Sequence, residues 1–210
     1  MKYIKLYESF EDIDTICEKY GIKNYTINSD GLVDVDDEVY LYKIELTKLP
    51  LKFGNVTGHF DCGANKLTTL KGCPQSVSGN FYCNNNELTS LEFCPQSVSG
   101  DFSCKYNQLT SLEFCPQSVG GYFACQDNQL KDLYSFPEFF DREVYHGDNP
   151  VQEILNLFKT ERIGKVINFL NEYGVIQQDG KVVILDRLEE VFYMLNLEIP
   201  KINLKNYEVY

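Results

Sequence analysis

The feature that most constrains this chain is a unit of 21 residues that repeats through its middle. Three clear copies begin at Leu67, Leu88 and Leu109, and the last two share the segment LTSLEFCPQSV. More divergent copies begin at Leu46 and Leu130. A period this short predicts a solenoid, in which each repeat forms one coil and buries its apolar side chains by stacking on its neighbours.

Within one repeat, Phe81 and Cys83 lie two residues apart, as on one face of a β-strand, and Asn86 follows the strand. Stacking therefore predicts ladders of Phe, Cys and Asn along a parallel sheet. The asparagine amides are expected to bond backbone groups of the turn and of the next coil. The same slots recur as Phe60, Cys62 and Asn65, as Phe102, Cys104 and Asn107, and as Phe123, Cys125 and Asn128.

This pattern resembles the leucine-rich repeat, whose core is L-x-x-L-x-L-x-x-N-x-L. It is most similar to the short bacterial form, on the residues Leu67-x-x-Leu70-x-x-Cys73-Pro74-x-x-Val77, with Cys in place of leucine in two slots. The resemblance covers residues 39 to 150. One extra residue, at Gly79, Gly100 and Gly121, lengthens each coil and is expected to supply a turn with positive φ before the strand.

The whole chain is also similar to a group of uncharacterised leucine-rich-repeat proteins of large tailed phages. The segments that carry this resemblance are YTINSDGLVDVDDEV, LTKLPLKFGNVTGHFDC, the CPQSV repeats and the tail segments NPVQEILNLF and VVILDRL. The resemblance implies an α/β leucine-rich-repeat solenoid with a parallel sheet of 21-residue coils. It also implies a location in the cytoplasm of a bacterial or phage-infected cell.

The flanks are expected to close the two ends of the solenoid. Residues 1–23 form an N-terminal amphipathic helix from Ser9 to Tyr20, with Ser9 and Asp12 as a capping box and Gly21 after its end. Residues 24–45 form a hairpin with an Asp30-Gly31 turn and the first-coil cap, in which Val39 and Leu41 continue the Phe and Cys ladders.

Residues 46–150 hold the repeats, and residues 151–210 form a C-terminal helix-hairpin-helix cap. Asn149-Pro150 is expected to open its first helix. A second helix carries Ile163 to Leu170, a third starts near Asp186, and a hairpin with an Asp179-Gly180 turn joins them. An independent functional domain in this tail is the alternative.

Composition excludes several classes of function. A net charge of −12 argues against nucleic acid, because binding of phosphates needs a basic patch. No apolar run is long enough for a membrane span, and MKYIKLYESF lacks the apolar segment of a secretory signal, so a soluble cytoplasmic protein is expected. The acidic run 34–38 fits a solvated strand edge, with calcium or a basic partner as alternatives.

The eight cysteines occupy core slots, so we expect reduced, buried thiols rather than a disulfide framework. Adventitious oxidation and a metal site are the alternatives, although no C-x-x-C pair exists. His146 falls in the Cys slot and is expected to be structural rather than a ligand or base. No cofactor is expected.

The two most similar repeats differ from each other only in or beside the strand. The copies at Leu88 and Leu109 differ at Ser99/Gly120, Asp101/Tyr122, Ser103/Ala124, Lys105/Gln126 and Tyr106/Asp127, all in or beside the strand. Outward strand positions are therefore the candidate binding face, and neutral drift is the alternative. The candidate partner-binding residues are His59, Asp61, Asn80, Tyr82, Asn84, Asp101, Ser103, Lys105, Tyr122, Ala124 and Gln126.

We therefore expect a non-catalytic protein-binding module that acts through the outward, concave strand face, for example as a phage-encoded blocker of a host protein. The first alternative is a virion component, because MKYIKLYESFED resembles phage leaders and Leu6-Tyr7-Glu8 resembles a prohead protease signal. The second is an effector-type ubiquitin ligase, but the tail after Asn149 has no Cys, and no nucleophile elbow, Walker loop or zinc-protease motif is present. The partner's identity and the oligomeric state stay open.

Overall fold

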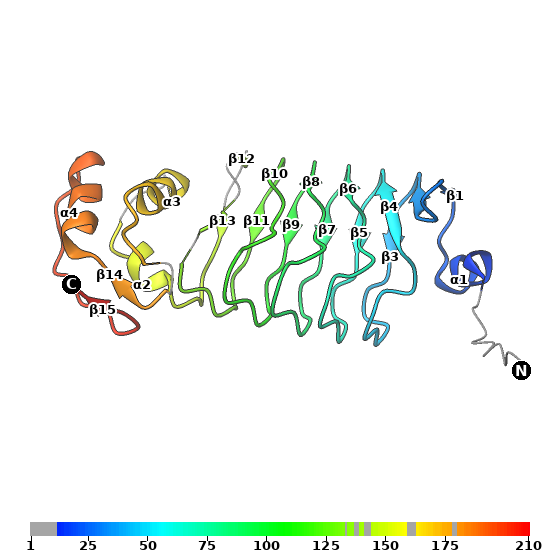
Figure 1. The fold of residues 1–210 in the computed structure, drawn as a ribbon, viewed down its shortest axis with the longest axis horizontal. Helices are drawn as coiled ribbons and strands as arrows, with labels where there is room; N and C mark the ends of the chain where they lie inside the picture. Colours follow the sequence, from blue (N-terminus) through cyan, green and yellow to red (C-terminus); the bar gives the residue numbers. More distant parts are fainter. Residues whose placement is uncertain (1–11, 133, 137–138, 141–143, 159–162, 178–179) are drawn as a thin grey trace, which may run out of the picture.

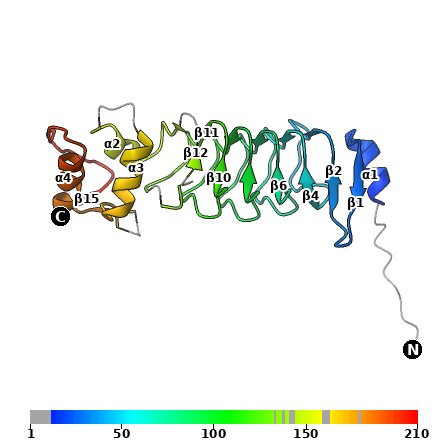
Figure 2. The same cartoon turned by 90° about the horizontal axis from the view of Figure 1, so that it is seen from above.

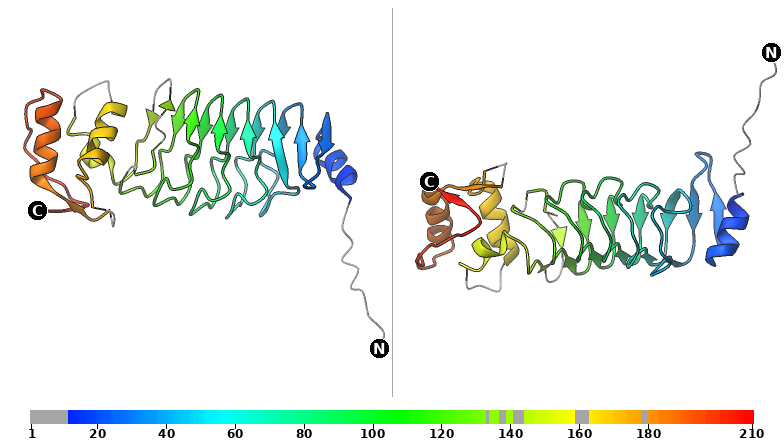
Figure 3. Two further views of the ribbon diagram at one scale, coloured as in Figure 1. Left: turned by 45° about the horizontal axis from the view of Figure 1, so that its top comes forward. Right: turned by 90° about the horizontal axis from the view of Figure 1, so that it is seen from below.

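The computed structural model describes residues 12–132, 134–136, 139–140, 144–158, 163–177 and 180–210. Coils stack in an almost straight row, with one helix at the N-terminal end and three at the C-terminal end (Figures 1 and 3). In these views the stack shows little curvature, whereas the resemblance leads one to expect a concave strand face. Among the described residues no helix combines the length and apolarity needed to cross a bilayer.

Each central coil contributes one strand to each of two parallel sheets, which face different sides of the stack (Figure 2). Sheet A contains β1 (Tyr25–Ile27), β2 (Val33–Val35), β4 (Phe53–Val56), β6 (Ser76–Val77), β8 (Ser97–Val98), β10 (Ser118–Val119) and β12 (Phe139–Phe140). Sheet B contains β3 (Val39–Tyr40), β5 (Phe60–Asp61), β7 (Phe81–Tyr82), β9 (Phe102–Ser103), β11 (Phe123–Ala124) and β13 (Val144–Tyr145).

The register confirms the predicted 21-residue coil. Phe81 pairs with Phe60 on one side and with Phe102 on the other, always between identical slots. The predicted parallel sheet is sheet B. Sheet A was not predicted, because its short Ser-Val strands lie in a segment that looked like a turn. In each of these strands the valine is buried and the serine lies on the outward side.

The core consists of the predicted inward rows. Phe60, Phe81, Phe102 and Phe123 are fully buried and stack ring on ring, with centroids 5.2 to 5.8 Å apart. In the three clear repeats, the first leucine and the leucine three residues later are equally buried. Close stacking of identical rings repeats the same apolar contacts in every coil, so each copy stabilises its neighbours in the same way.

The asparagine ladder has the predicted chemistry with one difference in direction. Asn107 accepts a hydrogen bond from the Leu88 N–H at 3.0 Å, at the start of its own 21-residue copy, and donates to the carbonyl of Cys83 in the preceding copy rather than in the next one. It also donates to the Cys104 carbonyl of its own coil. Asn65, Asn86 and Asn128 repeat this arrangement.

Asn149 is a fifth member of this ladder, bonded to the Leu130 N–H and the Cys125 carbonyl. The helix predicted to open at Asn149-Pro150 is present but begins two residues late, and the Asn149 side chain serves the ladder rather than the cap of the helix. Helix α2 (Gln152–Leu155) begins later, and its N-cap Val151 makes no side-chain capping bond. The 21-residue spacing from Asn128 was the signal that identifies Asn149 as part of the ladder.

The prediction of a positive φ at Gly79, Gly100 and Gly121 is also wrong, because none of the three adopts it. Each glycine instead allows close approach of the preceding coil. A Cβ on Gly79 would lie 2.6 Å from the Gly58 carbonyl oxygen, and one on Gly100 would lie 2.9 Å from that of Gly79. Successive coils touch backbone to backbone at this corner, which a side chain would prevent.

The N-terminal flank forms the predicted helix and hairpin. Helix α1 (Ile13–Tyr20) ends at Gly21 in the left-handed conformation, as expected. It is capped by Asp12, which accepts from the Thr15 N–H at 2.7 Å, whereas the predicted cap Ser9 lies outside the described residues. Strands β1 and β2 form the antiparallel hairpin. Strand β2 then pairs in parallel with β4 and so starts sheet A.

The acidic run 34–38 is bonded into the structure. Asp34 accepts from the Asn55 N–H at 2.6 Å, and Asp36 accepts from the Thr57 hydroxyl at 2.8 Å. These bonds connect the first coil to the second coil. Among the described residues no group of three His, Cys, Asp or Glu side chains could hold a metal ion.

At the C-terminal end, helices α3 (Ile163–Glu172) and α4 (Leu185–Met194) match the predicted helices, although Ile184 rather than Asp186 stands at the N-cap of α4. A single antiparallel bridge, Ile176 to Val183, forms the predicted hairpin, and Asp179 of its turn lies outside the described residues. Strand β14 (Val182–Val183) also pairs with β15 (Glu208–Val209), which was not predicted. Buried residues of this segment join the core of the coils.

All eight cysteines are buried as free thiols. Burial raises the pKa of the Cys115 thiol to about 12, because the thiolate would lose its hydration inside the core. The same cause raises the pKa of Cys73, Cys83 and Cys104. These thiols therefore stay protonated and act as small apolar side chains.

Candidate functional site

The candidate binding residues occupy three outward rows of sheet B. Taking one coil as an example, Asn80 precedes the buried Phe81, Tyr82 lies between Phe81 and Cys83, and Asn84 follows Cys83. The first row is His59, Asn80, Asp101 and Tyr122. The second row is Asp61, Tyr82, Ser103 and Ala124, and the third is Asn84, Lys105 and Gln126.

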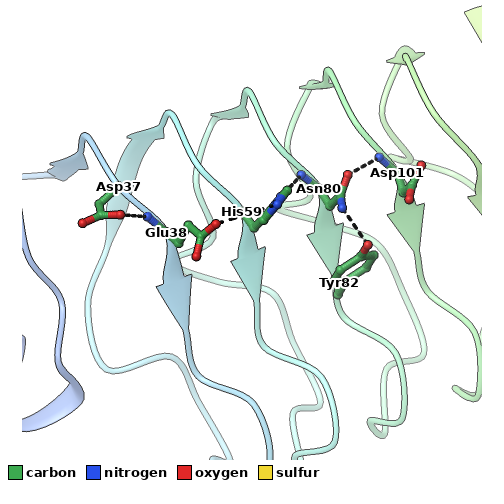
Figure 4. Close-up of polar contacts among 6 residues, drawn as sticks. All are labelled: Asp37, Glu38, His59, Asn80, Tyr82 and Asp101. Carbon is green, nitrogen blue, oxygen red and sulfur yellow. Dashed lines mark hydrogen bonds and ion pairs between the residues drawn. The ribbon is translucent and has the colours of Figure 1, made fainter.

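The first row has a structural role that the sequence analysis missed. His59 Nδ1 accepts from the Asn80 N–H, Asn80 Oδ1 accepts from the Asp101 N–H, and Asp101 Oδ1 accepts from the Tyr122 N–H, at 2.8 to 2.9 Å. Figure 4 shows the first two of these contacts, from His59 to Asn80 and from Asn80 to Asp101. Each acceptor satisfies a backbone N–H beside the close-packed glycine corner, so these three residues hold coils together.

The hydrogen bonds of the first row fix the tautomer of His59 and orient the ring of Tyr82. Because His59 Nδ1 accepts a hydrogen bond, its proton is on Nε2, which faces the Glu38 carboxylate at 3.8 Å. Asn80 also donates to the Tyr82 hydroxyl at 2.7 Å and so orients that ring (Figure 4). The row therefore links the structural corner of the coil to the aromatic side chains of the outward face.

Members of all three rows line a hollow of about 480 Å³. Eight of the eleven candidate residues line it, whereas His59, Asp61 and Asn80 do not. The lining residues are Tyr82, Asn84, Asp101, Phe102, Ser103, Lys105, Tyr122, Ala124, Gln126 and Tyr145. The sequence analysis missed Tyr145, although it lies 21 residues after Ala124 and continues the second row.

The hollow arises from the order of large and small side chains along the second row. Tyr82 and Tyr145 bracket Ser103 and Ala124, so two adjacent coils lack a large outward side chain. Three rungs separate the bracketing tyrosines, which corresponds to about 14 Å at the usual strand spacing. Differences between nearly identical repeats thus create a depression in an otherwise even sheet.

Aromatic rings form the walls. The rings of Tyr122 and Tyr145 lie with centroids 5.8 Å apart and planes tilted by 51°. Partial burial, followed by the negative charge of Asp101, raises the pKa of the Tyr82 hydroxyl, which stays neutral near pH 7. Neutral tyrosines present an apolar ring and a polar tip, a combination that suits contact surfaces.

Two buried polar atoms of residues that line the hollow have no hydrogen-bond partner among the described residues. They are Ser103 Oγ, on a side chain only 7 % exposed, and Gln126 Oε1. Leaving such atoms unpaired costs free energy, so the folded chain keeps unused hydrogen-bonding capacity at this place.

A second hollow, of about 410 Å³, lies on the sheet A side, where Phe93 contributes to its lining. Phe93 and Phe114 are about half exposed, and both adopt a positive φ, of 69° and 66°. Gly72 occupies the same slot in the preceding coil, where this conformation costs nothing. This face carries the unchanged residues Gln96 and Gln117 and is the competing candidate surface.

Comparisons with known proteins were made for the whole sequence. No protein-family model matches the chain, and neither a curated protein nor a solved structure matches it significantly.

Proposed function

We propose that this chain is a non-catalytic protein-binding module that uses the outward face of sheet B. The observation that carries the proposal is the tyrosine-walled hollow, whose base keeps unpaired polar atoms. Tyrosine and asparagine provide large contact area and adaptable hydrogen bonds at protein interfaces. Occupancy of a target, rather than chemistry, is the mechanism that suits such a face.

We also propose that the repeats are of the leucine-rich type and that the flanks act as caps. In support, each ladder asparagine follows its strand as in the leucine-rich-repeat consensus, and it bonds its coil to the one before it. Buried residues such as Cys17 and Val151 extend the core into both flanks. Protonated, buried thiols suit the reducing cytoplasm of a bacterial or phage-infected cell, where the chain would block a host protein.

The proposal is tested by capture of partners from native cells, with two sets of variants in parallel. Tyr82→Ala with Tyr122→Ala removes aromatic walls of the hollow, and Gln96→Ala with Gln117→Ala alters the sheet A side as a matched control. A specific partner is expected to be lost with the tyrosine pair only. A partner that is retained by the tyrosine pair and lost with the glutamine pair would move the site to the other face.

A protein that acts by occupying its target must be present in about the same amount as that target. Once a partner is purified, its inhibition is expected to reach completion near one chain per target molecule. If a trace of the protein inactivated its target progressively with time, the chain would be an enzyme and the proposal would be wrong.

A further inference from the structure

The base of the hollow limits what can fill it. Ser103 Oγ can donate or accept a hydrogen bond, whereas the carbonyl oxygen of Gln126, Oε1, can only accept. Both atoms are buried without a partner, so an occupant meets them once the Ser103 and Gln126 side chains turn toward the hollow. An occupant that recovers this lost hydrogen bonding must therefore bring N–H or O–H donors to the base, and more than one donor at close spacing serves it best.

The walls favour a flat group. Tyr82 stands on one side of the hollow, and the tilted pair Tyr122 and Tyr145 stands on the other. A planar group can stack on such rings while its edge points toward the base. A guanidinium group is planar, stacks on aromatic faces and carries five N–H donors around its edge. An ammonium group is compact and strongly hydrated, so it gains less from the same walls.

The charges of the hollow and of the whole chain favour a cationic occupant. The Asp101 carboxylate lines the hollow, and the chain as a whole carries a net charge of −12. Lys105 also lines the hollow, but its ammonium lies over the Tyr106 ring, 5.7 Å from the ring centroid, and Tyr106 is not part of the lining. An acidic surface attracts basic partners over a distance and leaves neutral ligands unaffected.

We propose that the hollow receives an arginine side chain exposed on the partner protein. The guanidinium would lie between the tyrosine walls and donate to Gln126 Oε1 and Ser103 Oγ, with Asp101 at the rim. This assignment rests on the proposed protein-binding function and adds the chemistry of the contact. Arginine is enriched at the energetic centres of protein interfaces, where aromatic pockets exclude water.

The test uses the full chain and a defined probe. The peptide acetyl-Gly-Gly-Arg-Gly-Gly-amide is titrated while backbone amide resonances are followed by NMR, beside the same peptide with lysine or citrulline. Citrulline keeps the shape of arginine without its charge. The arginine peptide is expected to saturate with a dissociation constant of about 1–10 mM, and the other two to bind about tenfold more weakly. Shifts are expected at residues 103, 105, 124 and 126.

Substitutions of Gln126 test the proposed contact with the arginine peptide directly. Gln126→Leu removes the acceptor and is expected to abolish saturation, whereas Gln126→Glu adds charge and is expected to tighten binding several-fold. Gln117→Leu makes the same exchange as the first variant on the exposed sheet A side and is expected to change nothing. Tighter binding in the glutamate variant cannot come from damage to the fold, so the two variants together separate recognition from stability.

Two outcomes would overturn the arginine assignment. One is equal binding, or no binding, of the arginine and citrulline peptides. The other is binding of an uncharged oligosaccharide, such as maltohexaose, that shifts the same resonances more strongly. If a partner protein still depends on Tyr82 and Tyr122 while the arginine peptide fails, the proposed function stands and only the arginine assignment falls.

Discussion

The inward and outward rows of sheet B come from alternate residues of the same strands, yet they follow different rules. The inward row repeats Phe in four successive coils, whereas the outward row between Phe and Cys changes from Asp61 to Tyr82, Ser103 and Ala124. Exposure alone does not explain the difference, because the outward serine of sheet A is the same in three successive coils. The comparison teaches that stacking of the coils constrains which residues occupy the inward row. The residues of the outward row are free to vary and are therefore available for function.

The largest expected effect comes from the buried thiols of the inward rows. Their folded pKa is raised above the unfolded value of 9.0, so the stability they contribute is complete below pH 9 and is lost as pH rises toward 12. Each such thiol lowers the free energy of unfolding by up to about 1.4 kcal/mol per pH unit in this window. Denaturant unfolding measured from pH 7 to pH 11 would show the decline.

The matched variant is Cys115→Ala, whose slope in the alkaline window should be shallower by the contribution of one thiol. If the free energy of unfolding stayed level from pH 8 to pH 11, the thiols would not be buried core residues. In that case the inward row would be no more constrained than the outward one.

The next largest effect is expected at the asparagine ladder. Asn107→Leu leaves the Leu88 N–H and the carbonyls of Cys83 and Cys104 without a side-chain partner, which should lower the free energy of unfolding by about 3 kcal/mol. Asn84→Leu, one turn earlier on the outward face, should change it by less than about 1 kcal/mol. Equal effects of the two substitutions would remove the distinction between the rows.

A smaller effect is expected at the glycine corner. Gly100→Ala places a Cβ 2.9 Å from the backbone of Gly79 and should lower the free energy of unfolding by about 1–3 kcal/mol. Gly147→Ala meets nothing within 4 Å and should be neutral or slightly stabilising. A harmless Gly100→Ala, measured by thermal or denaturant unfolding, would show that the coils do not touch at this corner.

Much of the fold follows from the sequence because every coil repeats the same local solution. The Phe and Cys slots predict strand alternation, and their 21-residue spacing predicts parallel stacking. Sheet B can therefore be predicted from the sequence alone. Sheet A escaped prediction because a Ser-Val pair is too short to show alternation. The glycine corner was misinterpreted because a tight turn and a close approach of two coils favour the same residue.

The site was predictable only in outline. Divergence between repeats placed the face on sheet B, but it could not separate residues that hold the coils from residues that line the hollow. His59, Asn80 and Asp101 vary in identity while each accepts the next coil's N–H, a role that several side chains can fill. The hollow depends on which neighbouring coils carry small side chains, as at Ser103 and Ala124, and only stacking reveals that order.

The most direct test of the central claim compares stability and binding in one pair of variants. Tyr82→Ala with Tyr122→Ala should weaken binding of an identified partner by at least about tenfold, which corresponds to 1.4 kcal/mol. The same variant should keep its thermal unfolding midpoint close to that of the unmodified chain, because both rings lie on the outward face. Unchanged binding, or a large fall in the unfolding midpoint, would contradict the account.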